Sequence, residues 1–296
     1  MGGTNIASHF RHEVQFYHTA MKNLGQSFPT DIFESILRYS SHSTLLTTSA
    51  VNRTFHLITR KYLFSLISLK STAYDRDTVS RARTFLSLLD HIPDISNFVR
   101  RIHIDCSGEN LLELSDDLSD TAPLIAVLSR LPRLNSISLR GRDPTTSNLS
   151  WLDWTTISIK LRQAFTRTFR SSLICEIKLS HIYNFSLSTF VQCRSLEHLS
   201  FNMVSSNESM LSHQDLEFRP KLKSLVLRNS FTFYDDDDEA NLRWLSSLQG
   251  LFDVSQLSEF VFSAGHSHMQ PARILSLCSE SIKSLELRMN TKGRFA

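Results

Sequence analysis

Glycine and proline are scarce in this chain of 296 residues, which contains 8 and 7 of them. So few of either argue against a disordered or collagen-like chain. They also argue against a β-rich fold held together by many glycine turns. The hydrophobic share of 41% and the charged share of 21% are ordinary for a globular protein, and the length suffices for one large domain or two.

Charge of one sign is also lacking, because 32 basic and 29 acidic residues leave a formal net charge of only +3. A balance this even predicts neither nucleic acid nor an anionic membrane as the partner. The longest apolar-rich stretch, Tyr62 to Leu69, is too short to cross a bilayer. No apolar run behind a basic segment opens the sequence, so we expect no secretory signal and a cytoplasmic or nuclear protein.

Metal-ligand and catalytic spacings are absent as well. The four cysteines are Cys106, Cys175, Cys193 and Cys278. They form no CxxC pair and no Cys/His pattern, so we expect small buried side chains in a reducing compartment. His266 and His268 stand without a third ligand, and no nucleophile elbow, phosphate-binding loop or HExxH motif occurs. We therefore expect no catalytic residue, no metal and no cofactor.

Three short helices are predicted after residue 27. Pro29 has no donor to lose at a helix start, and the two polar residues after it can accept from the free first-turn amides. Ile32, Ile36 and Leu37 then fall on one helical face. Further helices are predicted over 45–51 and 52–64.

A three-helix unit of about forty residues rarely stabilises itself without a staple, a metal or a partner surface. Its apolar side chains exceed what so small a core can hide. We therefore expect part of them to dock on another surface, either in the chain that follows or in a separate protein.

From residue 98 onward, short segments repeat the pattern apolar-x-x-apolar-x-apolar. These triads are Val99-Ile102-Ile104, Leu134-Ile137-Leu139, Ile174-Ile177-Leu179, Leu196-Leu199-Phe201, Leu222-Leu225-Leu227, Leu257-Phe260-Phe262 and Ile282-Leu285-Leu287. The shorter steps between triads match the roughly 20–29 residues of a leucine-rich repeat, and the longer steps indicate repeats with insertions. Helical stretches are predicted at 82–89, 123–131, 157–169 and 242–251. Such alternation predicts parallel strands on one side and helices on the other.

Residues 28–69 resemble an F-box. The matching pieces are FPTDIFESIL at 28–37, LL at 45–46, AVNRTF at 50–55 and YLF at 62–64. Phe28 stands where the family usually has leucine. An F-box followed by degenerate leucine-rich repeats is similar to a large set of fungal proteins. Regular leucine-rich repeats place an asparagine three residues after the last strand leucine, where its side chain caps the turn backbone. Only Asn290 fits this position here, so an irregular solenoid is expected.

The resemblance implies the substrate-recognition subunit of an SCF-type cullin-RING ubiquitin ligase, which does no chemistry itself. The F-box would dock on the Skp-type adaptor, and the repeats would hold an unidentified protein substrate near the transferring enzyme. Carried onto this sequence, the adaptor contact falls on Phe28, Pro29, Ile32, Ile36, Leu37, Leu45, Leu46, Val51 and Leu63. The alternatives are a repeat scaffold without a ubiquitin-ligase role and a hydrolase of unrecognised type.

The fold class expected is therefore α/β, with a three-helix module ahead of an irregular repeat solenoid. The domains expected are a loose segment 1–26, an F-box-like module 27–70, a helical linker 71–97 and a solenoid 98–296.

Two of the long repeat steps carry unusual compositions. One contains Trp151 and Trp154, and the other contains Asp235, Asp236, Asp237 and Asp238. Insertions project from one side of a solenoid and often carry its function, so we expect the substrate to touch one or both together with the strand face. The alternatives are tryptophans packed beneath their loop and a solvated acidic loop. The acidic run lacks the glycine turn and ordered ligand spacing of a calcium loop.

Overall fold

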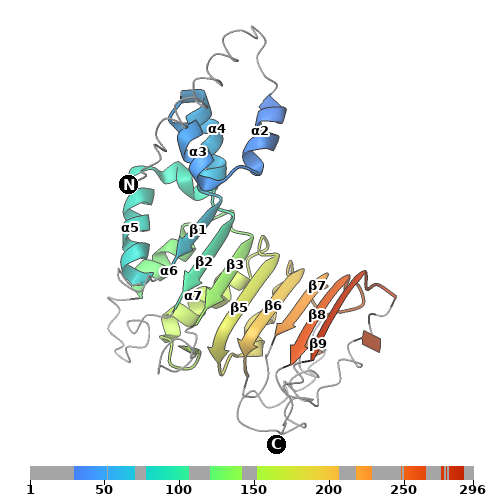
Figure 1. Ribbon diagram of the computed structural model, residues 1–296. Coiled ribbons are helices and arrows are strands. Elements are labelled where there is room, and N and C mark those ends of the chain that lie inside the picture. Colours follow the sequence, from blue (N-terminus) through green and yellow to red (C-terminus); the bar gives the residue numbers. More distant parts are fainter. Residues whose placement is uncertain are drawn as a thin grey trace, which may run out of the picture. The chain divides into compact units, whose positions relative to one another are not determined.

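The computed structural model describes residues 30–51, 53–70, 78–106, 121–141, 152–206, 218–228, 248, 250–264, 275–276, 278 and 280–289. The chain divides into two compact units, with the boundary between Leu63 and Phe64. Figure 1 shows the helices of the first unit and the long sheet of the second.

The first unit contains three helices, as predicted. They are α2 (Thr30–Arg38), α3 (His42–Ser49) and α4 (Arg53–Leu63). Helix α3 begins earlier than expected because the side chain of Ser41 accepts from the amide of Thr44 at 3.1 Å, which caps the helix. Phe33 of α2 stacks on Phe55 of α4 with the ring centroids 4.6 Å apart. This contact holds α2 against α4. The core of the unit is small, and its buried apolar residues among those described are Leu37 and Leu45.

The second unit is built on one nine-stranded sheet in which every strand pairing is parallel. The strands are β1 (Leu66–Leu69), β2 (Arg101–Asp105), β3 (Ser136–Arg140), β4 (Leu152–Asp153), β5 (Glu176–Tyr183), β6 (His198–Val204), β7 (Ser224–Arg228), β8 (Glu259–Ala264) and β9 (Ser284–Met289). They follow one another in chain order, except that the short β4 pairs with the end of β5 beyond the part paired with β3. The predicted α/β architecture is confirmed.

Helices connect the first strands and pack against one another in sequence order (Figure 1). They are α5 (Thr78–His91), α6 (Ala122–Ser129) and α7 (Ile159–Phe169), with the 3-10 turns η1 (Pro93–Asn97) and η4 (Leu187–Phe190). These match the helices predicted at 82–89, 123–131 and 157–169. The helix predicted at 242–251 lies mostly outside the described residues.

The strand register aligns the apolar triads into two continuous rows. One row is Ile67, Ile102, Ile137, Ile177, Leu199, Leu225, Phe260 and Leu285. The other is Leu69, Ile104, Leu139, Leu179, Phe201, Leu227, Phe262 and Leu287. From β2 to β8 every member is at most 1% exposed. Because alternate strand residues point to the same side, the two rows form the core between sheet and helices.

The sheet begins earlier than residue 98, where the sequence pattern placed it. Phe64, Ile67 and Leu69 already repeat the apolar spacing, and Ile67 pairs with Ile102 of β2. The segment 71–97, predicted to be a linker, contains α5, whose Val79 and Leu89 join the same core. The first repeat of the sheet therefore starts at the Leu63/Phe64 boundary.

Successive repeats are joined by a shared backbone carbonyl. The carbonyl of Arg100 accepts from the amides of Asn135 at 2.8 Å and Ser136 at 3.1 Å. The carbonyls that do the same elsewhere are those of Ser65, Asn135, Cys175, Glu197, Lys223 and Ser258. This carbonyl ladder fixes the start of each strand against the previous one without any side chain.

Strands β5 and β6 both kink near their ends. His181 has a φ of 56° and Met203 a φ of 57°, and the pairing resumes one residue later, between Ile182 and Val204. Gly141, which follows β3, donates its amide to the Ser180 carbonyl at 2.7 Å. The kink thus extends the sheet past the end of β3 and lets β4 join it.

Candidate functional site

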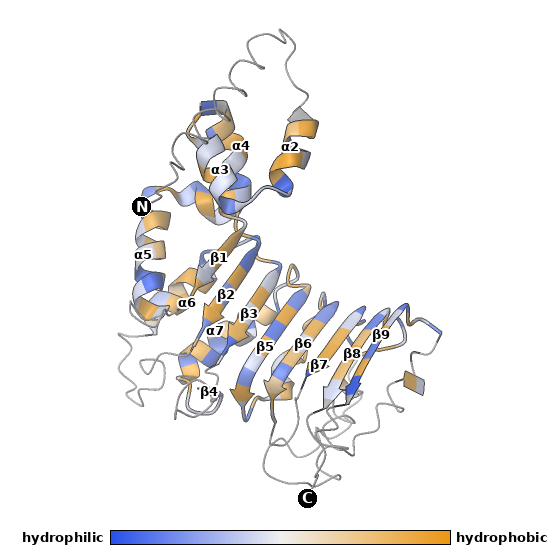
Figure 2. Cartoon of the chain, viewed as in Figure 1, coloured by the Kyte–Doolittle hydropathy of each residue, from blue (hydrophilic) through white to orange (hydrophobic). Residues whose placement is uncertain are grey.

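Exposed apolar side chains concentrate on the first unit. Ile32 and Ile36 of α2, Leu46 of α3 and Val51 after α3 are between 43% and 53% exposed. We call these four residues the apolar set. Ile32 and Ile36 lie one helical turn apart and therefore share a face of α2, and Figure 2 shows α2 as largely hydrophobic. All four belong to the adaptor contact that the F-box resemblance implies.

The other residues of that expected contact divide differently. Leu37 and Leu45 are only 2% and 6% exposed, so they hold the helices together and offer no free surface. Leu63 is half-buried at the end of α4. Phe28 and Pro29 lie outside the described residues.

Two exposed apolar residues of the first unit were not expected. Tyr39 after α2 is 85% exposed and Leu57 of α4 is 54% exposed. Leu57 lies between Phe55 and Ile58, which helical spacing turns inward, so the sequence pattern did not single it out. Both add to the apolar surface that three short helices leave open.

The expectation for Trp154 is wrong. Its side chain is 3% exposed, and its ring lies 4.8 Å from that of Phe185 and 6.0 Å from that of Phe165. Its amide donates to the carbonyl of Tyr183 at 2.9 Å, directly after β4 pairs with β5. Trp154 is therefore a core residue that packs β4 against α7, and it cannot anchor a partner. Trp151 lies outside the described residues.

The acidic insertion also lies outside the described residues. Its members are Asp235, Asp236, Asp237 and Asp238.

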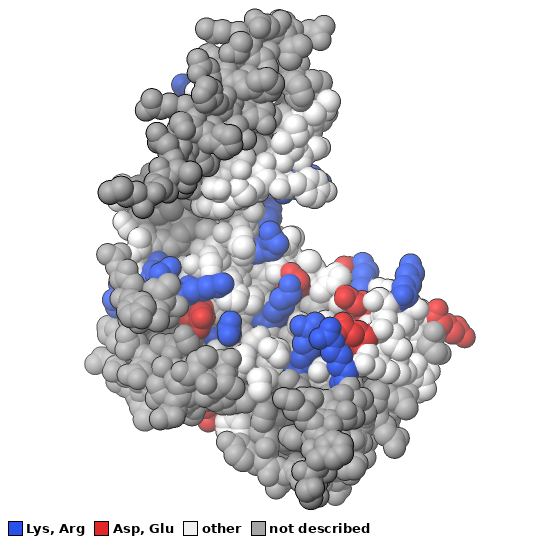
Figure 3. Space-filling view, viewed as in Figure 1, with Lys and Arg blue, Asp and Glu red and all other residues white. Residues whose placement is uncertain are grey.

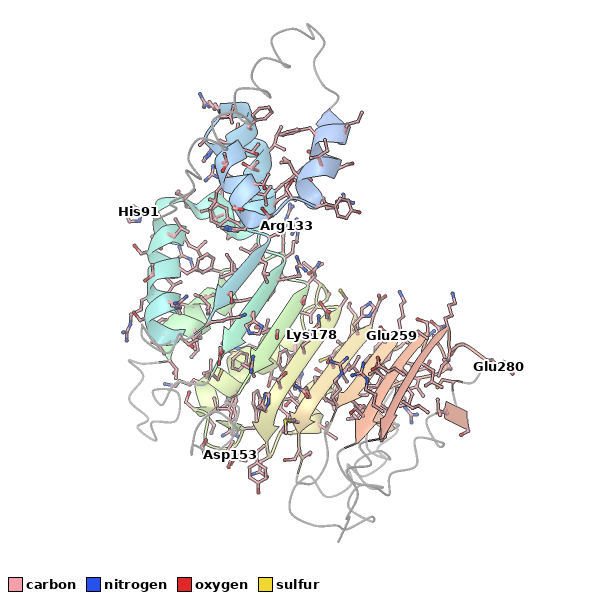
Figure 4. All side chains as sticks on the ribbon, in the orientation of Figure 1. His91, Arg133, Asp153, Lys178, Glu259 and Glu280 are labelled. Carbon is pink, nitrogen blue, oxygen red and sulfur yellow. The ribbon has the colours of Figure 1, made fainter. Side chains whose placement is uncertain are left out.

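The strand residues between the buried rows point to the opposite side of the sheet, and most of them are polar. We call them the strand face. Its rows are Arg101–Ser136–Glu176–His198–Ser224–Glu259–Ser284, His103–Ser138–Lys178–Ser200–Val226–Val261–Glu286 and Asp105–Arg140–Ser180–Asn202–Arg228–Ser263–Arg288. Figure 3 shows basic and acidic groups side by side over the sheet, and Figure 4 labels Lys178 and Glu259 among them. In Figure 4, no described helix of this unit lies in front of these rows.

Two equivalent hydrogen bonds order this face. The hydroxyl of Ser136 donates to Glu176 Oε2 at 2.6 Å, and the hydroxyl of Ser224 donates to Glu259 Oε2 at the same distance. Lys178 Nζ lies 2.6 Å from Glu176 Oε1. Each serine donates directly to a carboxylate and thereby holds the acid in one orientation.

The same contacts set the charge of Glu176. Burial by itself would raise the pKa of this carboxyl, but the hydrogen bonds from Lys178 and Ser136 outweigh it and lower the pKa. Glu176 is therefore a charged carboxylate, held by Lys178 and Ser136, at neutral pH.

The four cysteines are free thiols. Cys106, Cys193 and Cys278 are buried, and Cys175 is half-buried. Burial raises the pKa of Cys193 to about 12. Within the described ranges, no three His, Cys, Asp or Glu side chains gather closely enough to hold a metal ion. Across those same ranges, no helix has the length and apolarity needed to cross a membrane.

Comparison with known proteins gives no relative: no family model and no curated protein sequence matches this chain.

Proposed function

We propose that the protein is the non-catalytic substrate-recognition subunit of an SCF-type ubiquitin ligase. In this proposal, the first unit binds a Skp-type adaptor and the strand face of the second unit binds a protein substrate. The main support for it is the apolar set, because four half-exposed aliphatic side chains lie on the three-helix unit whose sequence resembles an F-box.

The physical argument for a partner at the first unit is one of solvation. Each half-exposed Ile, Leu or Val keeps apolar area in water, and burying it is worth roughly 25 cal/mol per Å². Monomeric proteins seldom leave several such side chains on so small a unit without a binding role. The F-box resemblance of residues 28–69 implies that this partner is a Skp-type adaptor.

The argument for a substrate at the strand face is one of charge and rigidity. Its side chains stand on a sheet whose register is fixed by backbone pairing from β1 to β9. Polar groups on rigid strands lose little freedom on binding, which favours specific recognition. The face holds carboxylates, Lys178 and Arg140 within one continuous surface, so it suits a polar protein segment.

The adaptor contact is tested by replacing Ile32 and Ile36 together with Ala and measuring binding to a purified Skp-type adaptor. We expect affinity to fall at least about tenfold, because a combined loss of about 1.4 kcal/mol from the two truncated side chains already has that effect. Stability should change little, since both side chains are half-exposed in the free protein.

Two matched controls separate adaptor binding from non-specific hydrophobic binding. Leu57→Ala removes an equally exposed side chain of the same unit, outside the expected contact, and Ile159→Ala removes a 61% exposed one from α7. Both should leave affinity unchanged. Wild-type protein that does not bind the adaptor, or equal losses in all variants, would favour a scaffold without a ubiquitin-ligase role.

A further inference from the structure

The last strand of the sheet has an uncovered side. Leu285 and Leu287 of β9 continue the two buried rows, yet they are 48% and 45% exposed, whereas Phe260 and Phe262 beside them in β8 are fully buried. At the other end of the sheet, Leu69 of β1 is only 2% exposed. Within the described part of the chain, no strand pairs with the outer edge of β9.

The backbone of that edge is also available for pairing. The amide of Ser284 points towards β8 and donates to the carbonyl of Ser258, the residue before that strand, at 2.9 Å. Because successive residues of a strand direct their N–H and C=O groups to opposite edges, Leu285 and Leu287 direct theirs away from β8. An exposed edge with outward amides and flanking leucines is a template for another strand.

The charges on β9 suggest which strand fits. Glu286 and Arg288 alternate with the leucines on the strand face, and their side chains form an ion pair with each other. In an antiparallel pair of two identical strands, the residues directly opposite each other are fixed by the position of the two-fold axis. An axis through Leu287 places Glu286 of each strand opposite Arg288 of the other.

Other registers of self-pairing fit less well. An axis through Glu286 would set two carboxylates opposite each other, and an axis through Arg288 would do the same with two guanidinium groups. Like charges directly opposite one another destabilise a strand pair, whereas opposite charges stabilise it. With the axis through Leu287, the Leu287 residues of the two copies face each other. Their amides and carbonyls point outward from the sheet edge, so the two residues exchange both backbone hydrogen bonds.

We propose that two copies of this protein associate through antiparallel pairing of their β9 strands, with the two-fold axis at Leu287. The occupant of the open edge is thus a second copy of the chain. On the helix side of the joined sheet, the two Leu287 residues lie opposite each other, and Leu285 of each copy lies diagonal to Leu287 of the other. On the strand face, two Glu286–Arg288 pairs form between the copies. The interface is isologous and closes at a dimer, and it does not depend on adaptor binding.

The test is the oligomeric state of the full chain and its charge-reversal variants, measured by sedimentation equilibrium over a concentration series. Wild type is expected to reach twice the mass of one chain. Glu286→Arg and Arg288→Glu each set like charges opposite one another, so each should raise the dimer dissociation constant about tenfold or more. An equimolar mixture of these two variants should pair as tightly as wild type, because every opposed pair is then of opposite charge.

The matched control is Arg140→Glu, which makes the same charge change on the strand face of β3, far along the sheet from β9. It should leave the dissociation constant unchanged, and all variants should keep the wild-type affinity for the adaptor. Pairing restored in the mixture also shows that the single variants are folded. A wild type that stays monomeric at its highest soluble concentration overturns the proposal. So does a dimer that both single variants leave intact, or a species that grows beyond two copies.

Discussion

Gly141 stands where the backbone of β5 leaves no room for a side chain. A Cβ atom there would lie 2.1 Å from the carbonyl oxygen of His181 and 2.7 Å from the Cβ of Leu152. Real Cβ atoms do not approach a backbone oxygen so closely, so any larger residue must displace the kinked part of β5 or the start of β4. The glycine thus permits the extension of the sheet that brings Trp154 into the core.

We therefore expect Gly141→Ala to lower the free energy of unfolding by about 1–3 kcal/mol, the usual cost of overpacking. Urea unfolding followed by circular dichroism measures the change. The control is Ser138→Ala in β3, which adds no atom to a packed site and should stay within about 0.5 kcal/mol of wild type. Equal stability of the two variants would show that the end of β5 or the start of β4 can shift to accommodate a Cβ atom at little cost in free energy.

His103 on the strand face makes stability depend on pH. Its Nε2 is buried without a hydrogen-bond partner among the described residues. Burial lowers the pKa of His103 from 6.5, and the charges of Lys70 and Arg140 act in the same direction, against that of Asp105. The unfolded chain therefore takes up the proton before the folded protein does.

The sign of the pH effect follows from that order. The free energy of unfolding should be highest above about pH 6.5 and should decline as the pH falls through this value towards the folded pKa. His103→Gln, which has no titrating group, should remove this part of the decline. Unfolding measured between pH 7.5 and pH 5.5, a range chosen to bracket about 6.5, distinguishes the two proteins. If the free energies of unfolding of wild type and His103→Gln changed with pH in the same way, His103 would not be the source of this decline.

At the scale of the element, β1 and α5 decide where the second unit begins. Strand β1 pairs with β2 along its whole length, and Leu69 closes the second buried row at this edge. Helix α5 carries five buried residues and packs against α6. Without these two elements, the row residues of β2 would be exposed as those of β9 are.

We expect a fragment of residues 64–296 to unfold in one cooperative step with the stability of the same unit in the full chain. A fragment of 98–296 lacks β1 and α5 and should be much less stable or aggregate, since it exposes Ile102 and Ile104 at a free edge. Thermal unfolding of both fragments, compared with the full chain, is the measurement. A stable 98–296 fragment would mean that the first repeat is dispensable.

The strands that could be predicted from the sequence all contain a repeated pattern of apolar residues. Each apolar triad fixes three inward positions, so the strands β2, β3 and β5 to β9 and their parallel order could be predicted. The triad at Phe64, Ile67 and Leu69 was hidden because it overlaps the end of α4, and helical spacing accounts for Phe64 equally well.

The candidate sites were less predictable for a different reason. Periodicity identifies which residues are apolar together, but burial depends on what packs against them. Leu37 and Ile36 are neighbours in α2, and only the fold shows that one is buried and the other half-exposed. The sequence leaves Trp154 open between a partner anchor and a residue packed beneath its loop, because nothing local reveals that β4 turns it towards Phe185. The kink at His181 that makes this possible has no signature in the sequence.

For the whole molecule, the division at Leu63/Phe64 separates two kinds of surface. The first unit offers aliphatic side chains on short helices, and the second offers fixed charges on a rigid sheet. Burial of apolar area supplies affinity, whereas oriented charges supply selectivity and faster encounter.

The carbonyl ladder has a consequence for how this protein changes over generations. The joint between repeats uses main-chain atoms, and the packing uses the two buried rows, so neither depends on the residues of the strand face. Substitutions at positions such as Arg140, Lys178 or Asn202 can therefore accumulate while the scaffold persists. Selection can therefore change the strand face one position at a time, and a gene of this architecture can acquire a different surface while it keeps the same fold.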